Sequence, residues 1–197
     1  MQPEDSVIPK FYGLPKVHKD RIPLRPIAAL RCAPTYNLAK WLFLQLNDLV
    51  SGFTSHGPQH SEFLSHIKDV CNEDAKIMVS FDITALFTCI PIDRARRILE
   101  AAITADQYLV DNSRLGQTQL LSLVDLCLTT TYFCFGGQIY HQRQCTPMGS
   151  PISGLIVELV MQHFEQQALH GDNMPKLWLR YIDDMFTIIE RESFDRF

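Results

Sequence analysis

Acidic residues stand at the ends of apolar runs in this sequence, and they constrain its fold more than any other feature. Asp183 and Asp184 are adjacent within the largely apolar stretch Leu177–Ile189, and Asp82 closes the apolar run Ile77–Asp82. A carboxylate brought into a low-dielectric core must be paired or must bind a metal. Two apolar strands that each carry acid at one end therefore predict a metal site built from oxygen ligands. Such ligands suit Mg²⁺ or Mn²⁺ rather than zinc.

Composition places the chain among ordinary globular proteins. It has 197 residues, of which 46% are apolar and 20% are charged, so one domain or two small subdomains are both compatible with its size. The sequence contains no run of about 18 apolar residues, so we expect no membrane-spanning segment. The six cysteines form no C-x-x-C pair and mostly lie in apolar stretches. This pattern favours reduced core cysteines of an intracellular protein. No targeting signal stands out, so the sequence does not decide the compartment, and the nucleus is one of those that fit.

Charge is distributed unevenly along the chain. Positions 1–45 carry seven basic and three acidic side chains, whereas the remainder carries eleven basic and nineteen acidic ones. A basic front and an acidic body would suit a phosphate-binding lobe that faces a metal-binding lobe. A chance distribution of solvated surface charges explains the difference equally well, so the charges alone do not indicate a function.

The order of the expected elements predicts an α+β fold. The prolines of positions 8–34 exclude a long helix there and favour extended segments and turns. Periodicity and turn signals then predict helices over 35–50, 62–73, 92–104, 118–131 and 151–169, a buried strand over 75–83, a hairpin of 132–135 with 138–142, and strands over 177–182 and 185–189. Antiparallel strands backed by helices on one face fit this order. If the strand ending at Asp82 lies beside the hairpin around Asp183, three carboxylates converge.

The chemistry of such a cluster depends on which way each acid faces. Adjacent residues of a strand point to opposite faces, so Asp183 and Asp184 cannot both aim at one point unless the turn rotates them. We expect Asp82 and Asp183 to be the primary metal ligands and Asp184 to be weaker. Two divalent ions about 4 Å apart can activate a hydroxyl nucleophile and stabilise a leaving oxygen in nucleotidyl transfer. The alternative is that Asp82 caps a helix and that the Asp-Asp turn is merely solvated.

Four motifs in this sequence resemble those of reverse transcriptases and occur in the family's order. They are Phe11–Lys19 with Leu24–Ile27, Ser80–Pro91, Gln144–Ser153 with His163–Glu165, and Tyr181–Asp184. The last matches the Tyr-x-Asp-Asp box, the second resembles the first catalytic motif, and the third resembles the motif that contacts template and nucleotide. The front segment is similar to Penelope-like retroelement enzymes in particular.

The resemblance implies a right-hand polymerase with fingers and palm. Fingers elements would occupy about 1–75 and 105–145, and palm elements about 76–104 and 146–197, with an antiparallel palm sheet backed by helices. The sequence stops shortly after the Tyr-x-Asp-Asp box, so we expect a core fragment without thumb or endonuclease. Those regions, or another chain, would then be partners.

The resemblance also assigns the acids. Asp82, Asp183 and Asp184 would bind two Mg²⁺ ions, or Mn²⁺, with the backbone carbonyl of Ile83 as a further ligand. Tyr181 would pack near the primer end.

The nucleotide-binding residues implied by the resemblance come from several segments. Arg25, with Lys16 or Lys19, would bind the triphosphate, since the guanidinium fork suits phosphate. The lysines could instead contact template phosphates or only solvent. Phe87 stands at the family's steric-gate position, where a ring rejects a 2′-hydroxyl and so selects dNTPs, and its alternative is core packing.

Two further residues of the third motif would line the nucleotide pocket. These are Met148 and Gly149, the glycine because it allows close backbone approach. Cys145 departs from the family, which often has glycine there, and Gly154 stands where proline is common. Neither departure removes a metal ligand.

Three functions are consistent with these residues. The leading one is the core of an RNA-directed DNA polymerase from a retroelement, which adds dNTPs to a DNA primer on an RNA template. The second is a catalytically incomplete remnant that binds nucleic acid through its basic front. The third is an unrelated metal-dependent phosphotransferase with Asp82 as nucleophile, which Thr84 disfavours because a second acid is expected at that position. Telomerase catalytic subunits share the palm chemistry, so a related role stays open.

Overall fold

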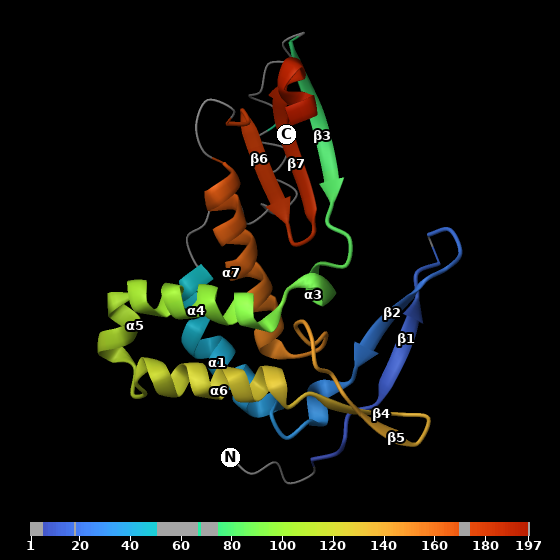
Figure 1. The fold of residues 1–197 in the computed structure, drawn as a ribbon, viewed down its shortest axis with the longest axis vertical. Coiled ribbons are helices and arrows are strands. Elements are labelled where there is room, and N and C mark those ends of the chain that lie inside the picture. The colour runs from blue at the N-terminus through green and yellow to red at the C-terminus, as the bar shows by residue number, and fades with distance from the viewer. Residues whose placement is uncertain (1–5, 18, 51–66, 68–74, 170–173, 197) are drawn as a thin grey trace. The chain divides into compact units, whose positions relative to one another are not determined.

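The computed structural model describes residues 6–17, 19–50, 67, 75–169 and 174–196, and the chain forms two compact units (Figure 1). The first unit comprises Met1–Ser51 and Phe87–Val160, and the second comprises Gly52–Leu86 and Met161–Phe197. The helix expected over 62–73 lies almost entirely outside the described residues. The expected boundaries between fingers and palm stay a prediction.

Two β-hairpins belong to the first unit. The proline-rich front forms β1 (Phe11–Pro15) and β2 (Leu24–Ala28), which pair antiparallel, and β4 (Tyr132–Phe135) pairs antiparallel with β5 (Gln138–His141). Both turn glycines of the second hairpin have positive φ, 58° and 79°, as the predicted tight turn requires. The Cys134 N–H donates to the Pro9 carbonyl at 2.7 Å, which joins the two hairpins next to an isolated parallel bridge.

Helices form the rest of the first unit. They are α1 (Tyr36–Leu46) with the 3₁₀ turn η2 (Asn47–Val50), α3 (Leu86–Cys89), which begins at the unit's edge, α4 (Ile92–Ala105), α5 (Gln107–Asn112), α6 (Gln117–Thr129) and the first part of α7 (Pro151–Ala168). A 3₁₀ turn, η1 (Leu30–Cys32), precedes them. The four long helices lie within one to four residues of their predicted bounds, because their apolar residues recur at helical spacing. The sequence did not predict α5, a helix of six residues that is too short to show periodicity.

The core of the first unit is built from the apolar faces of these helices. α1 and α4 both pack on α6. The most deeply buried side chains are Leu42 and Leu46 of α1, Leu99 and Ile103 of α4, Leu120, Val124 and Leu128 of α6, and Ile152, Leu155 and Ile156 of α7. Within the described ranges, no helix is both long enough and apolar enough to span a bilayer.

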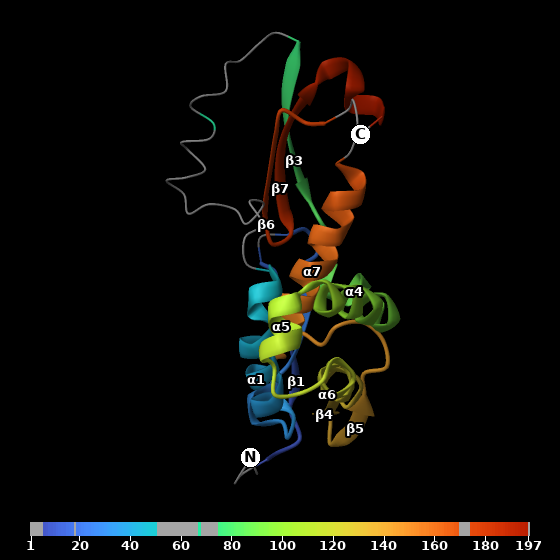
Figure 2. The ribbon, with the colours of Figure 1, turned by 90° about the vertical axis from the view of Figure 1, so that its left-hand side faces the viewer.

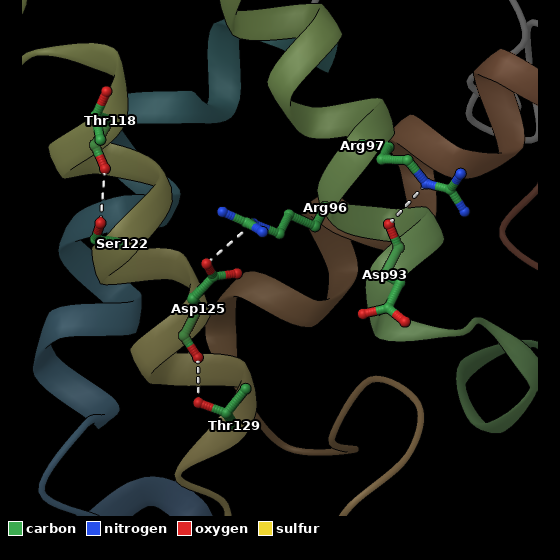
Figure 3. A network of polar contacts seen from close by, with 7 residues as sticks. All are labelled: Asp93, Arg96, Arg97, Thr118, Ser122, Asp125 and Thr129. Atoms are coloured by element: carbon green, nitrogen blue, oxygen red, sulfur yellow. Dashed lines mark hydrogen bonds and ion pairs between the residues drawn. The ribbon is translucent and has the colours of Figure 1, made fainter.

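A polar network marks the solvent-facing side of the α4–α6 contact (Figure 3). The Arg96 guanidinium lies 3.0 Å from the Asp125 carboxylate, and both side chains are partly exposed. On α6 itself, the hydroxyls of Ser122 and Thr129 donate to carbonyls one turn earlier, at 2.8 and 2.7 Å. Exposed pairs of this kind contribute about 1 kcal/mol or less, so apolar burial stabilises this contact more than the network does.

Only some of the cysteines are buried in the core, as the sequence predicted for them. The described ones are all free thiols: Cys32, Cys89, Cys127, Cys134 and Cys145. Burial raises the pKa of the Cys127 thiol to about 11, as expected of a core cysteine. The expectation was wrong for Cys32 and Cys89, which are exposed because they lie in a 3₁₀ turn and at a short helix end.

The second unit is a three-stranded antiparallel sheet with the order β3-β7-β6 (Figure 1). Its strands are β3 (Lys76–Asp82), β7 (Asp184–Glu190) and β6 (Leu177–Tyr181), and the 3₁₀ turn η4 (Arg191–Arg196) follows β7. The predicted neighbourhood of the Asp82 strand and the Asp183 hairpin is therefore confirmed. The expectation of a fully buried β3 was wrong, because Met78, Ser80 and Asp82 form an exposed face that alternates with half-buried residues.

The C-terminal part of α7 covers one face of this sheet, seen edge-on in Figure 2. Glu165 of α7 accepts hydrogen bonds from Arg180 Nε at 2.6 Å and from Trp178 Nε1 at 3.0 Å, both on β6. Arg180 adds a second contact through its terminal nitrogen, at 3.3 Å to the other carboxylate oxygen. The Arg180 and Glu165 side chains are only 1% and 6% exposed, so this forked ion pair joins helix to sheet inside the core.

We predict that breaking this buried pair destabilises the fold. Arg180→Ala leaves the Glu165 charge buried and should lower the free energy of unfolding by about 3–5 kcal/mol. The double variant Glu165→Leu with Arg180→Met should recover much of that loss, because it removes both charges together. Urea unfolding followed by circular dichroism measures both.

The matched control is Glu190→Gln, which removes an exposed partner of Lys76 at 3.7 Å. Its cost should be about 1 kcal/mol or less. A loss for Arg180→Ala no larger than that of the control would show that the buried pair is not a main support of the sheet.

Candidate active site

The pairing of β3 with β7 places two of the predicted acids directly opposite each other. Asp82 is the register partner of Asp184. The next residue, Ile83, donates its N–H to the Asp183 carbonyl at 2.9 Å. The Asp82–Asp184 pair therefore occupies a non-hydrogen-bonded position of the ladder, where opposite Cα atoms lie about 4.5 Å apart and side chains are closest. Both carboxylates share one face of the sheet, and both are exposed.

Asp183 lies in the two-residue turn between β6 and β7. Tyr181 pairs with Asp184 at the end of the hairpin, which leaves Ile182 and Asp183 as the central turn residues. Ile182 has φ of 58°, a left-handed conformation that is a genuine outlier for a β-branched residue. Positive φ at the first central residue alone is the type II′ pattern, which suits the twist of a hairpin. Such strain persists only where the surrounding structure enforces it, and it concentrates at functional sites.

The structure thus groups Asp82, Ile83, Tyr181, Asp183 and Asp184 in the second unit. Asp184 lies across from Asp82, while Asp183 is half-buried at the turn. The expected ranking, with Asp183 ahead of Asp184 as a metal ligand, stays a prediction. Tyr181 is 64% exposed, so its ring offers an open apolar surface beside the acids.

The donor chemistry of this corner fits a hard divalent cation. Like charges directly opposite each other on neighbouring strands are destabilising, and a cation removes that cost. In the part of the chain that the structure describes, no three His, Cys, Asp or Glu side chains form a ready metal site. Mg²⁺ at phosphoryl-transfer sites commonly binds one or two carboxylates together with substrate phosphates and water, and the Asp82–Asp184 pair supplies such carboxylates.

The expected triphosphate ligands lie on the β1–β2 hairpin of the first unit. Arg25 is exposed opposite Leu14 on β2. Lys16 follows β1 directly and donates its N–H to the Pro23 carbonyl at 2.9 Å, and Lys19 lies exposed in the loop that connects the strands. Arg25 and Lys16 fall on the same face by the alternation of the strand, because Lys16 is two residues after Leu14.

Phe87 is fixed by its backbone in the first unit. It belongs to the short helix α3, is half-buried, and its carbonyl accepts a hydrogen bond from the Thr146 hydroxyl at 2.7 Å. Thr146 is fully buried. This bond joins α3 to the loop that carries Met148 and Gly149, a contact that no sequence pattern indicated.

The backbone at Gly149 does come close to another group, but that group belongs to the protein and not to a nucleotide. It has φ of 105°, and a Cβ at this position would meet the Ala28 carbonyl oxygen at 2.5 Å. Only glycine fits there without displacing β2 or the loop. Met148 is half-buried beside it. Cys145 has φ of 65°, so the position where the family often has glycine is indeed left-handed in this chain.

We predict that the Asp82–Asp184 pair couples the fold to divalent ions. In EDTA, Asp82→Asn removes the repulsion and should raise the free energy of unfolding by about 0.2–1 kcal/mol. Added Mn²⁺ or Mg²⁺ should raise the melting temperature of the parent and leave that of Asp82→Asn unchanged. Thermal unfolding followed by intrinsic fluorescence measures both effects.

Asp111→Asn is the control, because Asp111 is an exposed carboxylate on α5, outside the candidate site. Its side chain accepts a hydrogen bond from Gln107 Nε2 at 2.9 Å. It should respond to the ions as the parent does. An equal response of Asp82→Asn and the parent would remove Asp82 from the proposed metal ligands.

Comparison with known proteins identifies the family of this chain. The profile of the reverse transcriptase (RNA-dependent DNA polymerase) family matches residues 23–194. Among curated protein sequences, none matches the chain significantly.

Solved telomerase structures share the fold. The apo telomerase of Candida tropicalis truncated from its C-terminal domain has a TM-score of 0.66 at 15% identity, over 100% of this chain and 47% of that one. The complex of Candida tropicalis telomerase with the TWJ fragment of telomeric RNA has a TM-score of 0.69 at 14% identity, over 100% of this chain and 38% of that one. The corresponding Candida albicans complex has a TM-score of 0.67 at 14% identity, over 99% and 38%.

This chain therefore spans less than half the length of the telomerase chains that it resembles. At these identities the likeness shows the fold alone, an α+β arrangement of the palm and fingers type with antiparallel sheets and helices. Because the family profile covers most of the sequence, the chain belongs to the reverse transcriptase (RNA-dependent DNA polymerase) family.

Proposed function

We propose that this chain is the core of an RNA-directed DNA polymerase, which adds dNTPs to the 3′ end of a DNA primer by two-metal-ion nucleotidyl transfer. The observation that supports it most directly is the register that sets Asp82 opposite Asp184, beside the Asp183 turn. The family profile covers all three acids, which belong to the segments that resemble the first catalytic motif and the Tyr-x-Asp-Asp box. We further propose a Penelope-like retroelement as its origin, from the front segment Phe11–Lys19.

Each acid has a distinct part in this proposal. All three acids bind the divalent ions: Asp82 and Asp184 present their carboxylates on a shared sheet face, and Asp183 presents its carboxylate from the turn. The Ile83 carbonyl is a further candidate ligand. When bound, two Mg²⁺ ions would activate the primer hydroxyl and neutralise charge on the reacting phosphates. Tyr181, exposed beside Asp184, would offer its ring to the primer terminus.

The first unit supplies the proposed contacts to the incoming nucleotide. The Arg25 guanidinium is exposed and suits bidentate hydrogen bonds to phosphate oxygens, with Lys16 or Lys19 adding charge. Phe87 would exclude ribonucleotides by contact with a 2′-hydroxyl. Met148 would contact the nucleotide, and Gly149 would fix the position of its loop through the close approach to Ala28.

An RNA template is the proposed partner. Two of the similar telomerase structures are complexes with a fragment of telomeric RNA. We infer by analogy that this chain binds RNA as well, with DNA as primer. Binding without incorporation would instead identify a remnant that keeps only nucleic-acid affinity.

We predict that nucleotide incorporation depends on the acids. On an RNA template with dNTPs and Mg²⁺, Asp82→Asn and Asp183→Asn should each lower the rate of primer extension by about a thousandfold or more. Loss of several kcal/mol of charge stabilisation in the transition state corresponds to such a factor. Gel analysis of a labelled primer measures the rate, and Asp111→Asn should extend as the parent does.

Rates within a few-fold of the parent for both variants would refute the site. No extension by the parent, with primer–template still bound, would refute the polymerase function and leave the binding remnant. A phosphorylated Asp82 trapped from a nucleotide would favour the phosphotransferase instead.

We predict that Phe87 sets sugar selectivity. Phe87→Ala removes the ring and leaves the backbone carbonyl that accepts from Thr146, so the loop contact persists. The preference for dNTPs over rNTPs should fall by about 10- to 200-fold. Single-nucleotide incorporation with each sugar measures the ratio, and an unchanged ratio would make Phe87 a packing residue.

A further inference from the structure

The buried ion pair of the second unit is poorly explained by stability alone. The Arg180 and Glu165 side chains are 1% and 6% exposed, and Arg180 Nε lies 2.6 Å from Glu165 Oε1. Two charges taken out of water lose their hydration, and apolar residues of similar volume are often at least as stable in their place. The best-attested use of buried polar groups is to specify one register. The position of this pair in the sheet shows which register it can specify.

The pair lies next to the acids of the candidate site in the strand ladder. Met185 of β7 is the register partner both of Arg180 on β6 and of Phe81 on β3, so these residues form one row across the sheet. The adjoining row is formed by Asp82, Asp184 and Tyr181. Residues of adjoining rows point to opposite faces, so the acids of that row lie on the face away from Arg180. Because the two rows share their backbone, a shift of the first row moves the acids of the second.

Glu165 of α7 holds β6 at two neighbouring positions of one face. Its Oε1 accepts hydrogen bonds from Arg180 Nε at 2.6 Å and from Trp178 Nε1 at 3.0 Å, and its Oε2 accepts from Arg180 Nη2 at 3.3 Å. The two contacts of Arg180 form a fork, which fixes the angle between guanidinium and carboxylate as well as their distance. β6 can therefore neither slide along Glu165 nor tilt away from it without breaking a hydrogen bond between buried charges.

The turn that follows Arg180 needs such a restraint. Ile182 has φ of 58°, which a β-branched residue adopts only where the surrounding structure enforces it. On the β3 side, the Ile83 N–H donates to the Asp183 carbonyl at 2.9 Å and holds the turn. On the β6 side, Arg180 stands two residues before Ile182, so the fork fixes the strand end from which the turn begins.

We propose that Arg180 and Glu165 are positioning residues of the candidate site. Their fork fixes the row beside the acids, and so sets the spacing of Asp82, Asp184 and the Asp183 turn at which divalent ions bind. Both side chains act from the opposite face of the sheet, through the backbone of β6 and β7. An apolar pair in their place would keep the sheet folded and loosen that spacing. The inference rests on the proposed function, since the task of the acids there is to bind metal.

The test separates folding from metal binding in one variant. Glu165→Leu with Arg180→Met removes both charges together, so we expect its sheet to fold. Mn²⁺ alone is the probe, and electron paramagnetic resonance measures its free concentration at a temperature well below the melting transition seen by circular dichroism. The dissociation constant for Mn²⁺ should rise about 10- to 100-fold over that of the parent, the range for groups that orient metal ligands. Arg180→Lys, which keeps the charge and loses the fork, should also bind Mn²⁺ more weakly than the parent.

Thr187→Val is the matched control. Thr187 is buried on β7 in the row of Trp178, and its hydroxyl donates to the Leu177 carbonyl at 2.9 Å. The substitution removes a buried hydrogen bond on the same face of the sheet, so it should lower the melting temperature and leave the Mn²⁺ dissociation constant unchanged. Asp82→Asn should abolish Mn²⁺ binding, which shows that the acids bind the ion.

Three results would count against the positioning role. A folded double variant that binds Mn²⁺ as tightly as the parent would overturn it. A loss in Thr187→Val equal to that of the double variant would also overturn it, because any loosening of the sheet would then weaken the site. If the double variant does not fold, Arg180→Lys decides: weaker Mn²⁺ binding supports the role, and binding equal to that of the parent overturns it.

Primer extension on the same variants separates this proposal from the polymerase function. The Mg²⁺ concentration for half-maximal extension should rise in the double variant while the KM for primer–template stays the same, a split that a general loss of fold would not give. Extension by the parent, with Mn²⁺ binding unchanged in the double variant, would overturn the positioning role alone. Mn²⁺ binding that needs Asp82 and weakens in the double variant, without extension by the parent, would overturn the polymerase function and keep the positioning role. A parent that binds no Mn²⁺ would overturn both.

Discussion

The register between β3 and β7 is the constraint on which the proposed chemistry depends. Asp82 and Asp184 share a face only because these strands pair as they do, and a slip of one residue would turn every β3 side chain to the other face. The sheet resists such a slip because it would turn Ile77, Val79 and Phe81 of β3 from the half-buried face to the exposed one. Glu165 fixes β6 on that same half-buried face, through its bonds to Trp178 and Arg180.

Much of this architecture could be predicted from the sequence, because its strands and long helices carry clear periodicity. The β6–β7 hairpin and the neighbouring β3 follow from apolar runs that end in acid. Which acid opposes Asp82 could not be predicted. It depends on the register between β3 and β7, two strands about a hundred residues apart in the sequence. The turn at Ile182 could not be predicted either, because no propensity indicates a positive φ for a β-branched residue. The open face of β3 was also missed, since the burial of an apolar run depends on what packs on each side.

The loop before α7 shows a similar division between what sequence and structure reveal. The motif indicated that Met148 and Gly149 matter, but only the structure shows that Gly149 is required by the nearby Ala28 carbonyl. The departure at Cys145 acquires a physical meaning, because its φ of 65° explains why glycine suits this position. Phe11 stacks on Phe133 although the two residues lie more than a hundred positions apart in the sequence, so no local pattern could predict that contact.

Metal-directed backbone cleavage would test the central claim most directly. With Fe²⁺ in place of Mg²⁺, ascorbate and peroxide generate hydroxyl radicals that cut the chain near the bound ion, and mass spectrometry locates the cuts. The account predicts cuts around Asp82 and around Asp183–Asp184 together, suppressed by excess Mg²⁺ and lost in Asp82→Asn. Cuts at only one of these segments, or cuts that persist in Asp82→Asn, would contradict a metal site shared by β3 and the β6–β7 hairpin.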